Sequence, residues 1–129
     1  MVTPTDPCPC GSSGPFGSCC LAIHHGEPAQ TAEQLMRSRY SAYAVGNLDY
    51  VWQTWHPATR PVGSMPDAVL PWVQLDIVDT VDGGPDDEYG EVEYRAHYRD
   101  GTGVATLHER SRFIRRAGRW FYEDGDILD

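Results

Sequence analysis

The sequence predicts an α+β protein in which N-terminal helices pack on a curved four-stranded antiparallel sheet, after a small cysteine-rich start. Three observations support this fold class. Apolar residues recur at helical spacing between residues 31 and 55, whereas apolar and polar residues alternate from Trp72 onward. All four cysteines lie between Cys8 and Cys20. A chain of 129 residues is long enough for one domain with its own core and a small appendage.

Two helices are expected in the first half of the chain. Thr31 stands three residues before Gln34, which is the capping-box pattern for a helix start, and Gly46-Asn47 marks the end of this helix. Its apolar face is formed by Met36, Tyr40 and Tyr43. Asn47 can cap a shorter helix over residues 48–55. The apolar stripe of that helix is expected to be Leu48, Val51, Trp52 and Trp55.

The remaining segments of this half are expected to connect these elements. Residues 21–30 are predicted to be a connector in which His24 and His25 are solvated. Residues 56–66 are rich in turn-forming residues and predict a loop, and residues 67–72 can add a helical turn.

Four strands are expected in the second half of the chain, over residues 72–81, 88–99, 104–116 and 120–127. The sequences DGGPDD, DGTG and AGR separate them. Short connections between successive strands indicate an antiparallel meander. The third segment would be about 40 Å long if it were straight, so it is expected to bend. Helices followed by a sheet predict that the helices cover one sheet face.

The four cysteines have the spacing Cys8-x-Cys10, eight residues, then Cys19-Cys20. Reduced thiols this close in sequence can supply a tetrahedral set of thiolates to Zn²⁺, and Phe16 can cover the ion. The alternatives are two disulfides or four unrelated thiols. Disulfides would close very small rings and would not tie this segment to the rest of the chain, so zinc is favoured. An ion with four protein ligands is expected to be structural.

Charge and hydropathy exclude several classes of partner. The net charge is −9, and most of it lies after residue 60, where seven arginines face fifteen acidic residues. Such a surface repels phosphate backbones, so no direct nucleic-acid binding is expected. The sequence contains neither a membrane-spanning apolar run nor a signal-peptide pattern, so no membrane association is expected. We therefore expect a cytoplasmic protein whose thiols stay reduced.

The sequence resembles two known modules. The spacing in CPCGSSGPFGSCC is similar to the SEC-C zinc module, and this resemblance implies that Cys8, Cys10, Cys19 and Cys20 are the metal ligands and that the module can dock on a protein partner. The stretches LMRSRYSAYAVGN, TWHP and ERSRFIRRAGRWFYEDG resemble the YchJ-like family. That resemblance implies a nuclear transport factor 2-like (cystatin-like) cone and does not imply an activity. The expected division is a knot and linker over residues 1–25 and a cone domain over residues 26–129.

Glu109 is the most informative candidate in the expected cone. It shares one face of the third strand with apolar residues, and a buried carboxylate is costly without a partner. Arg39, next to the apolar face of the first helix, is the first choice of partner and Arg37 the second. Two interpretations stay open. Either a buried Arg39–Glu109 bridge fixes the helix on the sheet, or Glu109 and an arginine belong to a pocket that binds a ligand or performs acid–base chemistry.

Other candidates have weaker support. His56 lies where the second helix gives way to a loop, and a loop or capping role is favoured over a catalytic one. Candidate ligand-binding residues besides the two arginines are Tyr43, Trp55 and Arg112. Trp55, Trp72 and Trp120 are expected in the core or in the pocket wall. The acidic runs at residues 76–82 and 86–88 lack the spacing of a calcium loop and are expected to be solvated surface.

Together these observations predict a cytoplasmic zinc-binding protein. Its structural zinc knot would precede a cone that binds a small molecule or a peptide. The alternative is an enzyme of proton-transfer or hydrolytic type that uses Glu109 and His56, and a third reading is a cone filled by its own side chains. Composition says nothing about oligomeric state, although cones of this class often pair through the open sheet face, which leaves a homodimer as an option.

Overall fold

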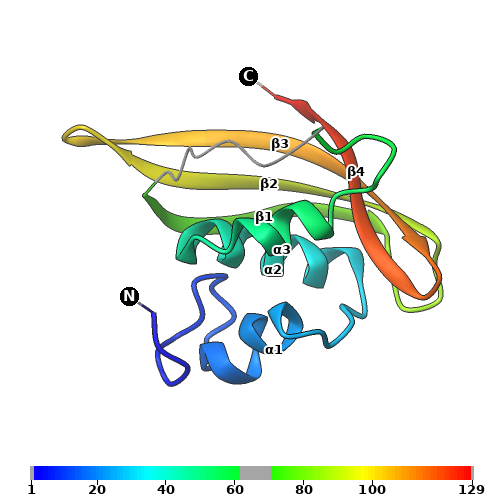
Figure 1. Cartoon of the computed structure of the whole chain (residues 1–129). Helices are drawn as coiled ribbons and strands as arrows, with labels where there is room; N and C mark the ends of the chain where they lie inside the picture. The colour runs from blue at the N-terminus through cyan, green and yellow to red at the C-terminus, as the bar shows by residue number, and fades with distance from the viewer. Residues whose placement is uncertain (1, 62–70, 129) are drawn as a thin grey trace.

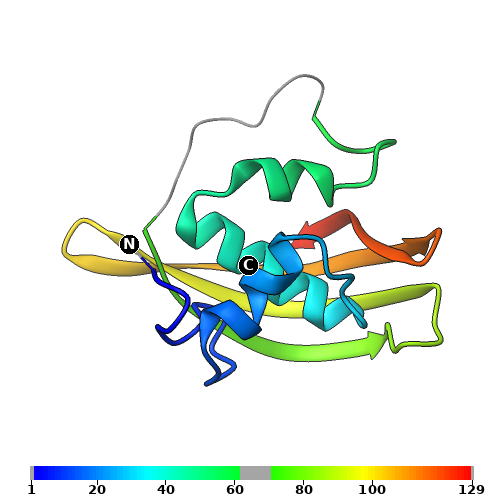
Figure 2. The ribbon, with the colours of Figure 1, turned by 60° about the horizontal axis from the view of Figure 1, so that its bottom comes forward.

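The computed structural model describes residues 2–61 and 71–128. The sheet forms one layer, helices α2 and α3 cover one of its faces, and the N-terminal segment lies against α2 (Figures 1 and 2). The bounds of the elements are as follows: the 3₁₀ helix η1, Phe16–Ser18; α1, Cys20–His24; α2, Ala32–Val45; α3, Leu48–Gln53; β1, Trp72–Asp82; β2, Tyr89–Asp100; β3, Gly103–Arg116; β4, Arg119–Ile127. This arrangement confirms the predicted α+β fold.

The sheet is an antiparallel meander of order β1-β2-β3-β4, as predicted. The alternation along β3 buries Glu109, Ser111 and Phe113 on the helix-covered face. The opposite face carries charged pairs, in which Arg110 reaches Asp79, Glu91 and Glu93. Pairing of β3 with β4 shifts between Arg112 and Phe113, and such a bulge bends a strand.

The two predicted helix starts are confirmed. The hydroxyl of Thr31 accepts a hydrogen bond from the Gln34 amide at 3.0 Å, and the side chain of Asn47 accepts one from the Tyr50 amide at 3.2 Å. Gly46 ends α2 in the left-handed conformation, at φ 82°. The predicted stripe of the second helix was partly wrong, because Tyr50 is buried with Val51 while Leu48 and Trp52 are half-buried.

The start of α2 is fixed by the turn between β1 and β2. The Ala32 amide donates to the Gly83 carbonyl at 2.9 Å. Gly83 has φ 79°, and a Cβ at Gly90 would lie 2.8 Å from the Gly83 nitrogen and 3.1 Å from the Ala32 Cβ. Both glycines are therefore required for the close approach of helix and turn.

The predicted connector after the cysteines contains a helix, and His24 is not solvated as predicted. Nε2 of His24 donates to the Ser38 carbonyl at 2.8 Å, and its ring lies 4.6 Å from the Tyr50 ring. Burial lowers the pKa of His24, so its ring is neutral at physiological pH. His25, in contrast, is exposed.

Within residues 2–61 and 71–128, no helix is both long enough and apolar enough to span a bilayer. The helical turn expected at residues 67–72 lies mostly outside the described residues, and Trp72 begins β1.

Candidate functional site

The sulfur atoms of the four cysteines form one compact group and lie within 4.8 Å of one another. Sγ of Cys10 is 3.7 Å from that of Cys19, which in turn is 4.0 Å from Sγ of Cys20. Ligands at the usual Zn–S length of about 2.3 Å, arranged as a tetrahedron, stand about 3.8 Å apart. These sulfurs therefore have the spacing of a four-thiolate metal centre.

The chemistry of this group also suits a cation. All four cysteines are free, and 3.7 Å is far longer than a disulfide bond of about 2.05 Å. Hydrogen bonds from Cys10 and Cys20 lower the pKa of the Cys8 thiol, whereas the interactions of Cys20 with Cys10 and Cys8 raise the pKa of the Cys20 thiol. A bound cation would stabilise further thiolates in the cluster, because metal ligation requires deprotonated cysteines.

Backbone turns and helix α2 position the sulfurs. The Cys8 amide donates to the Gly14 carbonyl at 2.9 Å, which folds the loop back on itself. Nη1 of Arg37 donates to the Cys10 carbonyl at 2.7 Å, and its Nε pairs with Glu33. Arg37 was a candidate ligand-binding residue of the cone, but it joins α2 to the cysteine-rich segment.

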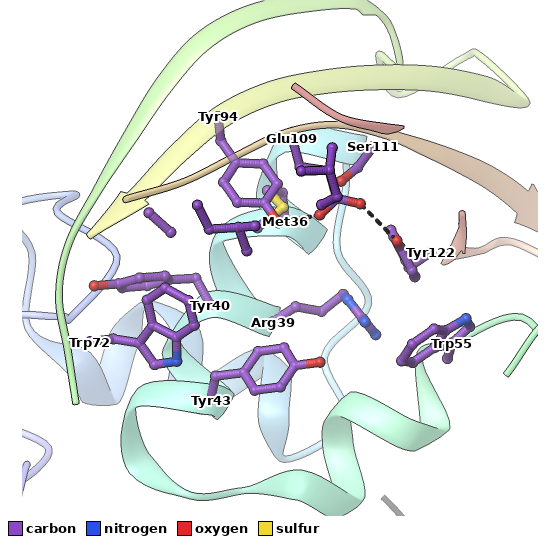
Figure 3. Close-up of a pocket in the computed structure, with 13 residues that line it drawn as sticks. Met36, Arg39, Tyr40, Tyr43, Trp55, Trp72, Tyr94, Glu109, Ser111 and Tyr122 are labelled. Carbon is purple, nitrogen blue, oxygen red and sulfur yellow. Dashed lines mark hydrogen bonds between the residues drawn. The ribbon is translucent and has the colours of Figure 1, made fainter. Parts of the chain in front are cut away.

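A separate cavity of about 360 Å³ lies between α2 and the sheet (Figure 3). Its walls are mostly aromatic and aliphatic, with a few polar groups that converge on the same space. The lining residues are Met36, Arg39, Tyr40, Tyr43, Trp55, Trp72, Tyr94, Ala96, Leu107, Glu109, Ser111, Tyr122 and Ile127. Such a volume and composition are typical of small-molecule sites.

Glu109 is held in this cavity by two tyrosines. The Tyr94 hydroxyl donates to Oε1 at 2.6 Å, and the Tyr122 hydroxyl donates to Oε2 at 2.9 Å (Figure 3). Tyr94 is directly opposite Glu109 in the β2–β3 ladder. Burial, followed by the charge of Glu109, raises the pKa of both phenols, so they act as hydrogen-bond donors.

Arg39 does not form the predicted bridge with Glu109: no ion pair joins the two among the residues that the structure describes. Nη1 of Arg39 donates to the Val51 carbonyl at 2.7 Å and to the Thr54 hydroxyl at 2.8 Å. The guanidinium lies over the Tyr122 ring, 4.7 Å from its centroid. Arg39 is only 4% exposed, and desolvation lowers its pKa.

The end of α3 brings the aromatic wall together. The Tyr122 amide donates to the Thr54 carbonyl at 2.8 Å, and the His56 amide donates to the Tyr122 carbonyl at 2.7 Å. These bonds join the residues after α3 to β4 and place Trp55 edge-on against Tyr122, with ring centroids 5.2 Å apart. Sequence alone could not show this contact, because the residues are far apart in the chain.

The predicted site residues therefore separate into two groups. Glu109, Arg39, Tyr43 and Trp55 line the cavity, as does Trp72, whereas Trp120 lies in the core. Arg37, Arg112 and His56 do not line it.

Arg112 points to the outer sheet face and pairs with Asp124 and Asp126. His56 accepts a hydrogen bond from the Ala58 amide through Nδ1 at 3.0 Å, which is a local capping contact. The structure thus does not bring His56 and Glu109 into one cavity. In the acidic runs, Asp76 pairs with His97, Asp79 with Arg110 and Glu88 with Arg115.

The sequence analysis missed Tyr94, Tyr122 and Ser111. Tyr94 alternates with Val92 and Ala96, all of them buried, so the strand pattern could have placed it on the inner face. Ser111 shares the inner face of β3 with Glu109 and is 1% exposed. Its hydroxyl, like Nε1 of Trp55, is buried and has no hydrogen-bond partner among the described residues.

Replacing Tyr94 with phenylalanine should destabilise the protein by about 1.5–3 kcal/mol, because a buried carboxylate loses a charged hydrogen bond. Urea denaturation measures the free energy of unfolding of each variant. The control is Tyr98→Phe in the same strand, since the Tyr98 hydroxyl makes no hydrogen bond with a described residue. Equal, small effects of the two substitutions would contradict the role assigned to Tyr94.

Comparison with known proteins assigns this architecture to a family. Residues 31–125 match the model of the YchJ middle domain, which is nuclear transport factor 2-like. The chain belongs to the YchJ-like (UPF0225) family. A UPF0225 protein of Streptomyces coelicolor is 49% identical over 127 residues, covering 98% of this chain and 99% of the relative. A UPF0225 protein of Cupriavidus pinatubonensis is 45% identical over 134 residues, covering 98% of this chain and 92% of the relative.

Two solved structures of SEC-C motif proteins have a similar fold. A SEC-C motif protein from Rhodopseudomonas palustris superposes with a TM-score of 0.82 at 31% identity, covering 96% of this chain and all of the other. A SEC-C motif protein from Psychrobacter arcticus superposes with a TM-score of 0.78 at 25% identity. The superposition covers 100% of this chain and 86% of the other. The family and the SEC-C resemblance predicted from sequence are confirmed.

Proposed function

We propose that this YchJ-like protein holds a structural zinc ion through Cys8, Cys10, Cys19 and Cys20 and binds a small molecule in its cone. The mutual spacing of the four sulfurs supports the metal proposal, because it matches a tetrahedral thiolate set. With four protein ligands the ion would have no open position for water or substrate. Its role would be to fold the N-terminal segment, whose own apolar cluster is small.

The small-molecule proposal rests mainly on the cavity between α2 and the sheet. Aromatic walls and convergent polar groups are what a ligand of modest size requires. The buried, unpartnered hydroxyl of Ser111 adds support, since a native core rarely leaves such a group without a partner. A peptide side chain or chain end is the other occupant that this volume would admit.

Thiol chemistry supports a cytoplasmic location within the same proposal. A thiolate metal centre needs reduced cysteines, and reducing compartments preserve them. All four cysteines here are unpaired with one another.

Native mass spectrometry of the protein purified from cells tests both parts of the proposal. We expect one zinc ion per chain, released only when the protein is denatured or the cysteines are oxidised, and additional mass when a ligand is retained. A metal-free protein with two disulfides would contradict the first part. Failure of both phenylacetate and phenylacetamide to bind in the cone would contradict the second part.

A further inference from the structure

The cavity contains a buried positive charge that forms no ion pair with an acidic side chain of residues 2–61 and 71–128. Arg39 projects from α2 into the cavity and is 4% exposed (Figure 3). Its two hydrogen bonds, both from Nη1, go to the neutral oxygens of Val51 and Thr54. Nε and Nη2 make none with a described residue. An arginine is always charged in proteins, and a buried charge without a counterion is costly.

Glu109 does not supply the missing counterion. Both of its oxygens already accept hydrogen bonds from phenols, those of Tyr94 and Tyr122. The ring of Tyr122 lies between the two charged groups, since its hydroxyl contacts Glu109 and its face contacts the guanidinium. The site is therefore organised to keep Glu109 in place and to leave one edge of the Arg39 guanidinium unused.

The guanidinium is also rigidly oriented. Its Cζ lies 4.7 Å from the Tyr122 ring centroid and 5.5 Å from that of Trp55, while Nη1 is fixed by the end of α3. A preorganised planar fork of N–H donors suits a carboxylate, which accepts two parallel hydrogen bonds. Much of the remaining wall is aliphatic or aromatic, with Met36, Tyr40 and Leu107 among its residues.

We infer that the cone binds a monocarboxylic acid with a flat apolar body, the carboxylate on Arg39 and the body among the aromatic walls. This inference depends on the proposed small-molecule site and names its ligand class. The volume of about 360 Å³ limits the body to roughly one or two rings. The negative charge of Glu109 in the same space disfavours a second anionic group on the ligand.

The test compares phenylacetate with its neutral analogue phenylacetamide by NMR titration of the full ¹⁵N-labelled chain. We expect phenylacetate to bind roughly 10- to 100-fold more tightly, because hydrogen bonds between charged partners are the stronger ones. Shifts should concentrate on the residues that line the cavity. Equal affinities would overturn the carboxylate assignment and leave the small-molecule site intact, whereas failure of both probes to bind would overturn both proposals.

Substitutions test whether Arg39 is the residue that binds the carboxylate. Arg39→Gln should abolish the preference for the acid over the amide, while Arg95→Gln, on the outer sheet face, should leave it unchanged. A folded Arg39→Gln protein that keeps the preference overturns the inference. If this variant fails to fold, Leu107→Trp, which fills the cavity without changing charge, should weaken both probes, and the wild-type comparison still decides the ligand class.

A carboxylate can belong to a free acid or to the end of a peptide. The tripeptide Gly-Gly-Phe and its C-terminal amide separate these sources. We expect the tripeptide acid to bind more weakly than phenylacetate, because a cavity of about 360 Å³ must also admit its backbone. Tighter binding of the tripeptide acid would overturn the free-acid assignment and identify a peptide chain end as the ligand.

Discussion

Replacing Cys10 with serine should abolish stable metal binding and unfold the N-terminal segment. Cys10 is fully buried, and its sulfur is 3.7 Å from that of Cys19. Besides the cysteines, the apolar cluster around the sulfurs contains Phe16 with the half-buried Val2 and Leu21, so without the proposed ion this segment would have only a small core. Structural zinc sites contribute about 10–16 kcal/mol of binding free energy near neutral pH, and loss of one thiolate removes a large part of it.

Metal analysis and NMR measure the two effects of this substitution separately. We expect resonances of residues 2–20 to collapse to unfolded positions, while those of the sheet persist because the main core does not depend on the sulfurs. The control is Ser18→Ala in the same segment, which should retain one metal ion per chain. Full retention of zinc by Cys10→Ser, with an unchanged spectrum, would refute the four-thiolate centre.

Replacing Gly125 with alanine should destabilise the protein by about 2–4 kcal/mol, although the residue lies on an edge strand. A Cβ at this position would overlap Oε2 of Glu109 and lie 2.8 Å from its Cδ. The carboxylate would have to leave its two tyrosine donors, and the alternative is a shift of β4. Either response leaves buried polar groups without hydrogen-bond partners, which lowers the free energy of unfolding.

Urea unfolding of four variants, Gly125→Ala, Gly103→Ala, Glu109→Ala and the double variant, isolates this steric conflict. Gly103→Ala is the control, because a Cβ there meets nothing closer than 3.8 Å and should change stability by no more than about 0.5 kcal/mol. In Glu109→Ala combined with Gly125→Ala, the cost should be clearly less than the sum of the single effects. Additive costs would show that Gly125 acts independently of Glu109.

Local sequence patterns predicted the elements of this fold because their causes are local. The Thr31 and Asn47 caps depend on residues three positions apart, and both hydrogen bonds form. The alternation on β3 placed Glu109 inside because successive side chains of a strand point to opposite faces. The cysteine spacing brought the sulfurs together within a single loop, for the same local reason.

Contacts between distant elements were predicted less well. His24 looked like a linker residue, but it packs on Tyr50 and bonds to the Ser38 carbonyl. The charges of Arg39 and Glu109 suggested an ion pair, whereas each found neutral partners instead. The alternation of side chains along one strand does not show which hydroxyls from other strands will reach a buried carboxylate.

The amino-acid sequence by itself determined α2, α3 and the four strands, the inward face of β3 and the clustering of the thiols, since these depend on spacing along one segment. The tertiary structure alone decided that Tyr122 would separate Arg39 from Glu109. That outcome required the end of α3 to pair with β4, a contact between residues far apart in the chain. The physical reason is that a guanidinium and a carboxylate are each held by whichever groups the packed elements bring within hydrogen-bonding distance.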